Sequence, residues 1–337
     1  MSFLVLFLFF AIILWQLFKK NTIDAVSQYH VRIVAHSKGW LKQHLPVVTF
    51  YLAYPRFIHS EMMTHKDFSR SAASSRAIPV AKMLAQVWNN PAMPLHWGIN
   101  QPGMKAERYF VGWKRNFLRN LWQLCGRMVC VFVWVAMKMG LHKQTANRML
   151  EPWQLMHVTL TTCKLANFFN LRIHKDAQPE ICFLATAMKH AVDGSSPVRL
   201  NQGDWHLPWV EDEDYILAAQ HLKHLTTTDT VTDLLKKMSA ARCARSSYAN
   251  FDGDRSINGD LKTYSKLVDS APVHASPCEH QATPDELKYA PVVDTHVVNA
   301  GDNRIGFVRQ WSSWRLHGNL TGYIQYRNTI PNHYKPD

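Results

Sequence analysis

Three segments of the chain gather basic, hydroxyl and amide side chains, the groups that proteins use to bind phosphate. The first segment, residues 64–76 (THKDFSRSAASSR), contains the candidates His65, Lys66, Ser69, Ser74, Ser75 and Arg76. Backbone N–H groups and hydroxyls at the start of a helix bind phosphate, and arginine adds bidentate, charge-assisted hydrogen bonds. We therefore expect an anion-binding turn that leads into a helix here. A solvated basic loop with capping serines is the alternative.

The second segment, residues 167–181 (NFFNLRIHKDAQPEI), places Asn167 and Arg172 near the end of an expected helix. A lone arginine in this position more often forms an ion pair at the surface. The third group consists of residues 241–248 (ARCARSSY), which include Ser247, and a later stretch that begins at His274.

That later stretch, residues 274–284 (HASPCEHQATP), contains His274 and His280. An isolated histidine is more often structural than catalytic, and this spacing matches no standard set of zinc ligands, so no metal site is predicted. From residue types alone, the three segments together predict a protein that binds anionic, nucleotide-like ligands.

Composition narrows the class of protein. The 337 residues hold 38 Lys and Arg against 25 Asp and Glu, a net charge of +13, and this excess favours anionic partners. With 47% hydrophobic and 19% charged residues the chain forms a packed core. The six cysteines form no C-x-x-C pair, which indicates reduced thiols. Walker, Rossmann, zinc-protease and serine-hydrolase motifs are absent from the sequence.

The elements that must position the candidate residues are mostly helical. We expect helices at 79–89, 106–139, 147–170, 177–191, 212–225, 230–244 and 261–268, and strands at 47–52, 305–308 and 323–326. Thr230 and Asp233 have the spacing of a capping box at the start of one helix. The pattern predicts an α+β fold, a helix-rich domain around a small mixed or antiparallel sheet.

The first twenty residues form a separate unit in this interpretation, followed by one catalytic domain over 21–337. Phe3 to Phe18 is apolar except for Gln16, but sixteen helical residues rise only ~24 Å, less than the roughly 30 Å of a bilayer core. A membrane anchor, a buried or amphipathic helix, and a mis-assigned start codon remain open. The second apolar stretch, Leu121 to Met139, contains charged residues and is expected to be a core helix.

Taken together, these segments resemble the flavin-dependent thymidylate synthases, the ThyX family, in particular the versions found in phage genomes. The family signature R-H-R-x-x-S-x-N-x-x-S-x-R is matched at His65, Ser69, Ser74 and Arg76. It departs at three positions, where the chain has Thr64, Lys66 and Ser71.

Four further segments are similar to segments of the family: RMLEP at 148–152, NFFNLR with AQPEI, ARCARSSY, and HASPCEH. The last two precede the signature in the usual family order, whereas here they follow AQPEI, as in a circular permutation. Exposed termini and loops tolerate such a permutation.

The resemblance implies FAD-dependent reductive methylation of dUMP to dTMP, with methylenetetrahydrofolate and NADPH as co-substrates. It also implies a homotetramer with sites where subunits meet. The location implied is cytoplasmic, in the host if the protein is from a phage, with a membrane contact through residues 3–18 left open. Other hypotheses are a hydroxymethylating variant, a non-catalytic flavin- or nucleotide-binding relative, and a nucleic-acid-binding protein.

The resemblance also assigns roles to residues. The flavin side would be lined by His65, Lys66, Ser69, Asn167, Ser247 and His274. The dUMP phosphate and sugar would be held by Ser74, Ser75, Arg76 and Arg148. Arg172 would face the uracil, and Arg172 and His274 would be the catalytic residues. Reaction at uracil builds negative charge on the ring carbonyl oxygens, which a fixed guanidinium stabilises, and loss of such a donor costs ~3–4 kcal/mol.

Overall fold

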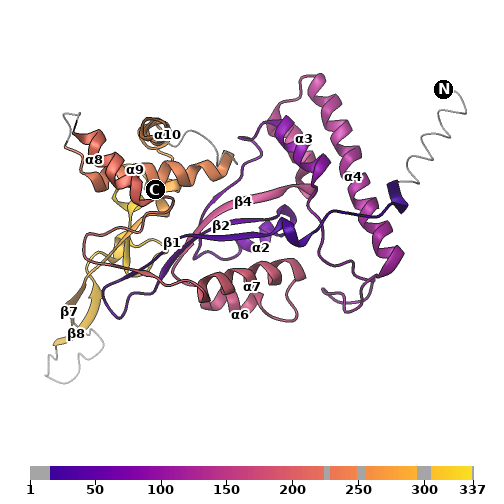
Figure 1. Cartoon of the computed structure of the whole chain (residues 1–337). Helices are drawn as coiled ribbons and strands as arrows, with labels where there is room; N and C mark the ends of the chain where they lie inside the picture. Colours follow the sequence, from indigo (N-terminus) through magenta and orange to yellow (C-terminus); the bar gives the residue numbers. More distant parts are fainter. Residues whose placement is uncertain (1–15, 224–227, 249–255, 294–304, 336–337) are drawn as a thin grey trace, which may run out of the picture.

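A five-stranded sheet lies at the centre of the computed structural model, which describes residues 16–223, 228–248, 256–293 and 305–335 (Figure 1). The strand order is β3-β4-β2-β1-β5. All neighbours are antiparallel except β1 and β5, so the sheet is mixed, as predicted. The strands are β1 (His30–Gly39), β2 (Val47–Pro55), β3 (Ser69–Ala72), β4 (Leu155–Thr162) and β5 (Val198–Leu200).

One face of the sheet is apolar and carries the main hydrophobic core. Phe50 of β2 lies opposite Leu160 of β4, and both are fully buried. Helices that contribute to the same core include α3 (Val80–Asn89), α4 (Gly112–Lys138), α6 (Ala166–Arg172) and α7 (Pro179–Asp193). Helices around a mixed sheet make this an α+β protein.

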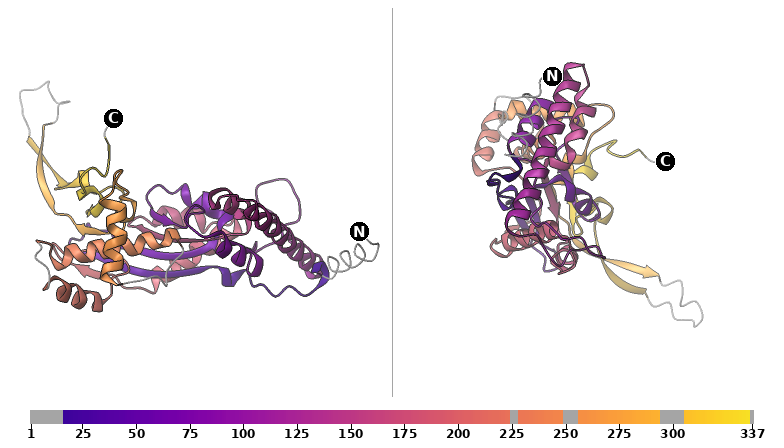
Figure 2. Two further views of the ribbon diagram at one scale, coloured as in Figure 1. Left: turned by 90° about the horizontal axis from the view of Figure 1, so that it is seen from above. Right: turned by 90° about the vertical axis from the view of Figure 1, so that its right-hand side faces the viewer.

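The other face of the sheet is polar and is covered by the C-terminal part of the chain. This part contains helices α8 (Asp212–Leu222), α9 (Val231–Ala244) and α10 (Ile257–Val268). It also contains two small sheets, β6 (Ala282–Pro284) with β9 (Tyr323–Gln325), and β7 (Leu287–Val293) with β8 (Ile305–Trp311). Figure 2 shows these elements at one end of the molecule, the β7–β8 pair projecting from it, and α4 at the opposite end.

An ion network holds the C-terminal helices together. Arg242 of α9 donates to Asp214 of α8 and to Asp260 of α10, and Arg245 donates to the second oxygen of Asp260. The side chains of Arg242, Asp214 and Asp260 are nearly inaccessible to solvent, so each charge depends on its partner. The predicted capping box is present at the start of α9, where Thr230 and Asp233 exchange hydrogen bonds.

The structure corrects the prediction of one long helix over residues 147–170. The segment is instead a 3-10 helix (Asn147–Trp153), strand β4, and the short helix α6. Met156, Val158 and Leu160 of β4 enter the core, while the alternate residues face the polar side. This period of two is the pattern of a strand, and pairing of β4 with both β2 and β3 fixes it.

Helix α4 is a core helix on one face only. Cys130 and Val133 enter the core, but only 28% of the most apolar 18-residue stretch of α4 is buried. In the described part of the chain, α4 is the one helix long and apolar enough to cross a membrane. The prediction of a core helix is therefore wrong for the outer face of α4, which is exposed to solvent. The apolar N-terminal stretch lies outside the described residues as far as residue 15.

The six cysteines form no disulfide, as their spacing predicted. Two of them, Cys243 and Cys278, lie in the third predicted group of segments. Both are buried, and burial raises the pKa of Cys278 to about 12 and that of Cys243 well above its usual value. Neither thiol is ionised at neutral pH, so neither is an activated nucleophile.

Candidate functional site

Arg172, at the last position of α6, is the centre of the best-formed polar cluster among the candidate residues. Its Nε donates to Nε2 of His65 at 3.0 Å, although the two residues are 107 positions apart. Its Nη1 donates to Glu61 at 2.8 Å and its Nη2 to Oγ1 of Thr64 at 3.1 Å. The fold therefore brings the first two of the three segments predicted to bind phosphate into contact at Arg172.

Aromatic packing beneath this cluster holds α6 against the loop that carries His65. The His65 ring stacks on Phe68 and meets the edge of Phe168, which α6 buries in the core. On the other side, Nη1 of Arg70 donates to the carbonyl oxygens of Met62 and His65. The His65 imidazole is thus fixed by contacts on its ring and on its backbone.

The protonation states in the cluster follow from these contacts. Burial, reinforced by the charges of Arg172 and Arg70, lowers the pKa of His65, so the ring is neutral at pH 7. Since Nε2 accepts from Arg172, the ring proton lies on Nδ1. Burial raises the pKa of Glu61, while the adjacent Arg172 opposes this shift. The ion pair between Glu61 and Arg172 holds the Arg172 guanidinium in one orientation.

Arg172 also lines a cavity of about 370 Å³. Cavities of roughly 300–1,000 Å³ hold small-molecule ligands. The charged and polar lining residues are Glu61, His96, Lys105, Tyr109, Arg172, Asp176, Gln178 and Glu180. Two cationic groups face three carboxylates here, so the cavity suits the neutral part of a ligand better than a phosphate.

A second cluster joins the Ser74–Arg76 turn to the segment that carries Arg148. Asn147 is fully buried and its Nδ2 donates to the carbonyl oxygens of Ser75 and Ile78, which ties the two segments together. Oγ of Ser74 accepts from the backbone N–H of Arg76 at 3.3 Å. The Arg76 and Arg148 side chains are both exposed, and Arg148 contacts Glu151 at 3.4 Å.

The remaining cofactor candidates divide between the surface and the interior. Lys66 and Asn167 are exposed, close in sequence to His65 and Arg172 respectively. Ser69 is fully buried in β3, where its hydroxyl donates to Asn319 at 3.1 Å and accepts from Gln325 at 3.2 Å. The Ser69 hydroxyl is therefore satisfied within the protein rather than presented to a ligand.

The third predicted segment lies against the polar face of the sheet, away from the Arg172 cluster. The backbone of Ser247 is in a 3-10 helix (Arg245–Tyr248), and its side chain lies outside the described residues. Its neighbour Ser246 contacts Oγ1 of Thr159 at 2.6 Å. His274 is exposed in a loop, where its backbone N–H donates to the Leu267 carbonyl. Within one chain, the structure does not bring His274 to Arg172.

A buried chain of hydrogen bonds crosses the polar face of the sheet. His280, fully buried, links Ser71 (3.0 Å) to Thr161 (2.8 Å). Thr161 contacts Thr49 at 2.6 Å, and Thr49 contacts the second fully buried imidazole, His206, at 2.8 Å. Burial lowers the pKa of both imidazoles to about 3, so both are neutral at physiological pH.

Three residues of these clusters escaped the sequence analysis as participants. Glu61 stands four positions before His65, so one helical turn separates them, and this spacing is a signal that was available. Asn147 directly precedes Arg148 but has no distinguishing pattern of its own. His280 was noted within its segment, yet its role in the polar chain depends on Thr161 and Ser71 of the distant sheet. Among the described residues, no three His, Cys, Asp or Glu side chains cluster as metal ligands.

Comparisons with known proteins place few limits on the chain. It matches no protein-family model and no curated protein. Among solved structures it is similar to thymidylate synthase X (ThyX) from Helicobacter pylori with FAD and dUMP, with a TM-score of 0.30 and 16% identity. The match covers 43% of this chain and 67% of that chain.

A second solved structure gives the same picture. This flavin-dependent thymidylate synthase ThyX from Helicobacter pylori, complexed with FAD and dUMP, has a TM-score of 0.30, 17% identity and the same coverage. At this TM-score the likeness says nothing of what this chain binds.

Proposed function

We propose that the chain is a flavin-dependent enzyme that transfers a one-carbon unit to a pyrimidine nucleotide, with dUMP as substrate and dTMP as product. The observation that carries the proposal is the contact between Arg172 and His65. These residues belong to the two segments with the most extended resemblance to the ThyX family, and they meet beside a cavity.

The cavity residues fit the pyrimidine ring of dUMP. A guanidinium has five N–H donors, and His65, Glu61 and Thr64 use three of the N–H groups of Arg172. Two donors remain for ring carbonyl oxygens, where negative charge develops during reaction at the ring. Because Glu61 fixes the guanidinium in advance, this stabilisation needs no reorganisation in the transition state.

The phosphate of dUMP belongs to the second cluster in this proposal. Arg76 and Arg148 are exposed, and Asn147 holds their segments together. Ser74 and Ser75 supply the polar backbone of the turn. Along the sequence, His65 of the first cluster precedes the four-residue strand β3, and Ser74 of the second cluster follows it. The family's homotetramer, with sites shared between subunits, is part of the proposal because several residues lie apart within one chain.

FAD would supply the hydride chemistry, and methylenetetrahydrofolate and NADPH the carbon unit and the reducing equivalents. The exposed Lys66 and Asn167 flank the Arg172 cluster and are available to such anionic ligands. His65 is neutral and offers Nδ1–H as a hydrogen-bond donor. A cytoplasmic location follows from the same proposal, because these co-substrates are metabolites of that compartment.

The test uses the full chain, purified and reconstituted with FAD. We expect bound flavin absorbance, and flavin oxidation that requires both dUMP and the folate. In Arg172→Ala the flavin should remain bound while dUMP-dependent oxidation falls by about 10²–10³-fold, as for loss of an oxyanion-stabilising donor. Arg199→Ala, which removes an exposed arginine on β5, is the matched control and should retain activity.

Each outcome decides a part of the proposal. No flavin binding would reject the cofactor, and wild-type turnover in Arg172→Ala would reject the role of this residue. Thermal unfolding of both variants shows whether Arg172→Ala is folded. Mass analysis of the nucleotide product distinguishes the methyl from the hydroxymethyl group, and analytical ultracentrifugation tests the tetramer.

A further inference from the structure

The outer face of α4 is apolar and exposed to solvent along five turns. Exposed residues recur there every three or four positions, as on one face of a helix. They are Leu121, Cys125, Met128, Phe132 and Val135, followed by Met139 directly after the last residue of the helix. Phe132 is 56% exposed and Met139 is 83% exposed. Contiguous apolar surface of this kind marks an interaction site.

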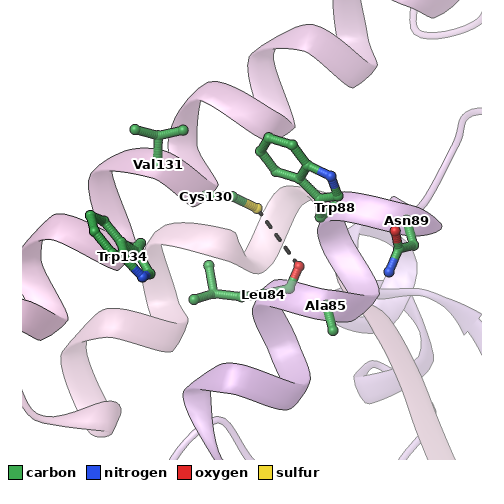
Figure 3. Close-up of a pocket in the computed structure, with 7 residues that line it drawn as sticks. All are labelled: Leu84, Ala85, Trp88, Asn89, Cys130, Val131 and Trp134. Carbon is green, nitrogen blue, oxygen red and sulfur yellow. Dashed lines mark hydrogen bonds between the residues drawn. The ribbon is translucent and has the colours of Figure 1, made fainter.

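An apolar groove adjoins this face, between α3 and α4 (Figure 3). The groove has a volume of about 310 Å³. Trp88 of α3 and Trp134 of α4 flank it, both about half exposed, and Cys130 lies at its floor with Leu84. Its dimensions and lining suit a hydrocarbon chain.

The two helices that form the apolar surface carry charges of one sign. Helix α4 contains five basic residues and no acidic residue, and α3 contains one lysine and no acidic residue. Arg127 lies over the Trp88 ring, Lys138 over Trp134, and Lys114 over Trp113. Two copies of α4 packed together would place these cations opposite one another. An anionic partner is therefore favoured over a second copy of the chain.

The chain itself continues from this surface into more apolar sequence. Phe18 packs on Phe117 of α4, Nδ2 of Asn120 donates to the Leu17 carbonyl, and Gln16 accepts from Arg127. The residues that precede Gln16, from Phe3 onward, contain no charged side chain. An apolar segment thus begins at the same face of the molecule.

We propose that this surface, formed by the outer face of α4 and the groove beside α3, docks on a bilayer of anionic phospholipid. The exposed apolar residues of α4 lie at the level of the acyl chains, and the groove receives one acyl chain. Lys114, Arg127 and Lys138 contact the lipid phosphates. Amphipathic helices with basic flanks bind in this manner, and tryptophan is enriched at the interface.

Helix α4 docks in the plane of the bilayer and does not cross it. Cys130 and Val133 on its inner face belong to the protein core. Gly126 lies so close to Trp153 that an added Cβ would be 2.9 Å from its ring. A spanning orientation would require α4 to leave this packing, whereas an in-plane orientation keeps it.

The experiment reads the depth of α4 directly, because the N-terminal segment alone can retain the full chain on vesicles. Cys125 is the exposed cysteine on the outer face of α4, and in the Cys182→Ser background it takes a nitroxide label. Its accessibility to oxygen and to an aqueous nickel chelate is measured with vesicles of phosphatidylcholine and with vesicles that also contain phosphatidylglycerol. The control label is on Ser265→Cys, exposed on α10, with Cys125 and Cys182 both replaced by serine.

We expect the Cys125 label to enter the bilayer only with the anionic vesicles, and the Ser265→Cys label to stay in water. Phe132→Asp with Val135→Asp should return the Cys125 label to water. Ile216→Asp with Leu217→Asp, two exposed apolar positions on α8, is the matched control and should leave its depth unchanged. Lys114→Gln and Lys138→Gln should each weaken vesicle binding by roughly five-fold, the factor for about 1 kcal/mol per lysine at an anionic surface.

Three results would overturn the proposal. The first is a chain that does not bind the anionic vesicles. The second is a bound chain whose Cys125 label stays in water, which would assign binding to the N-terminal segment alone. The third is a Cys125 label that is shielded in the absence of vesicles, in a particle of twice the mass of one chain. This result would assign the face to a second copy of the chain.

Discussion

The two buried imidazoles on the polar face of the sheet predict a specific loss of stability in acid. His206 and His280 are fully buried and hydrogen-bonded only to hydroxyl groups of the described residues. Among the described residues, these hydrogen bonds include no carboxylate that could compensate a positive charge on either imidazole. Burial lowers both pKa values to about 3, whereas an unfolded histidine titrates near 6.5.

The sign and the size follow from proton linkage. Well above pH 6.5 the histidines are neutral in both the folded and the unfolded state, so they add no pH dependence there. Between pH 6.5 and 3 the unfolded state binds more protons than the folded state, so the free energy of unfolding falls as the pH falls. From pH 7.5 to 5.0 the loss is about 2 kcal/mol for each histidine and about 4 kcal/mol for both.

The assay is urea unfolding at pH 7.5 and at pH 5.0, followed by tryptophan fluorescence. His206→Gln and His280→Gln each lower stability at pH 7.5, but each should reduce the difference between the two pH values by about 2 kcal/mol. His274→Gln, at an exposed histidine, is the control and should leave that difference unchanged. If His280→Gln keeps the full wild-type difference, the imidazole accepts a proton in the folded state, and the reasoning from burial is refuted.

Substitutions at three further positions test the fold by urea unfolding at pH 7.5. Arg242→Leu leaves Asp214 and Asp260 buried without their shared partner and should cost about 3–5 kcal/mol; a loss below 1 kcal/mol would contradict the ion network. Thr230→Ala removes the cap of α9 and should cost about 1 kcal/mol, whereas Thr230→Ser should restore most of it. Gly126→Ala places a methyl group 2.9 Å from the Trp153 ring and should cost about 1–3 kcal/mol, a result that unchanged stability would contradict.

Local signals in the sequence predicted the parts of the fold that local interactions decide. Thr230 and Asp233 form the predicted capping box, because both partners lie within one helical turn. Strand β4 was misread as helix because apolar residues continue on both sides of Leu155–Thr162 and satisfy a helical period as well. Only the pairing of β4 with β2 and β3, across about a hundred residues, decides between the two periods.

The candidate site was predictable in its residue types but not in its contacts. The resemblance to the ThyX family named both Arg172 and His65, and the structure shows that they touch. It gave no sign that Glu61 neutralises the guanidinium or that Ser69 is already satisfied. The partners of Ser69, Asn319 and Gln325, lie about 250 positions away, so no local pattern reports them.

The C-terminal part of the chain completes the polar face of the central sheet. Ser246 and His280 belong to the third predicted group of segments, and both form hydrogen bonds with β4, at Thr159 and Thr161. These contacts require only that the C-terminal part reach the polar face of the sheet, by whichever end of the chain it is connected. Since the hydroxyl-lined face has few apolar contacts to offer, hydrogen-bonding imidazole and hydroxyl groups are what a covering segment must bring. Any covering segment must supply such groups to Thr159 and Thr161, whereas the Arg172 cluster is built from residues that precede the C-terminal part.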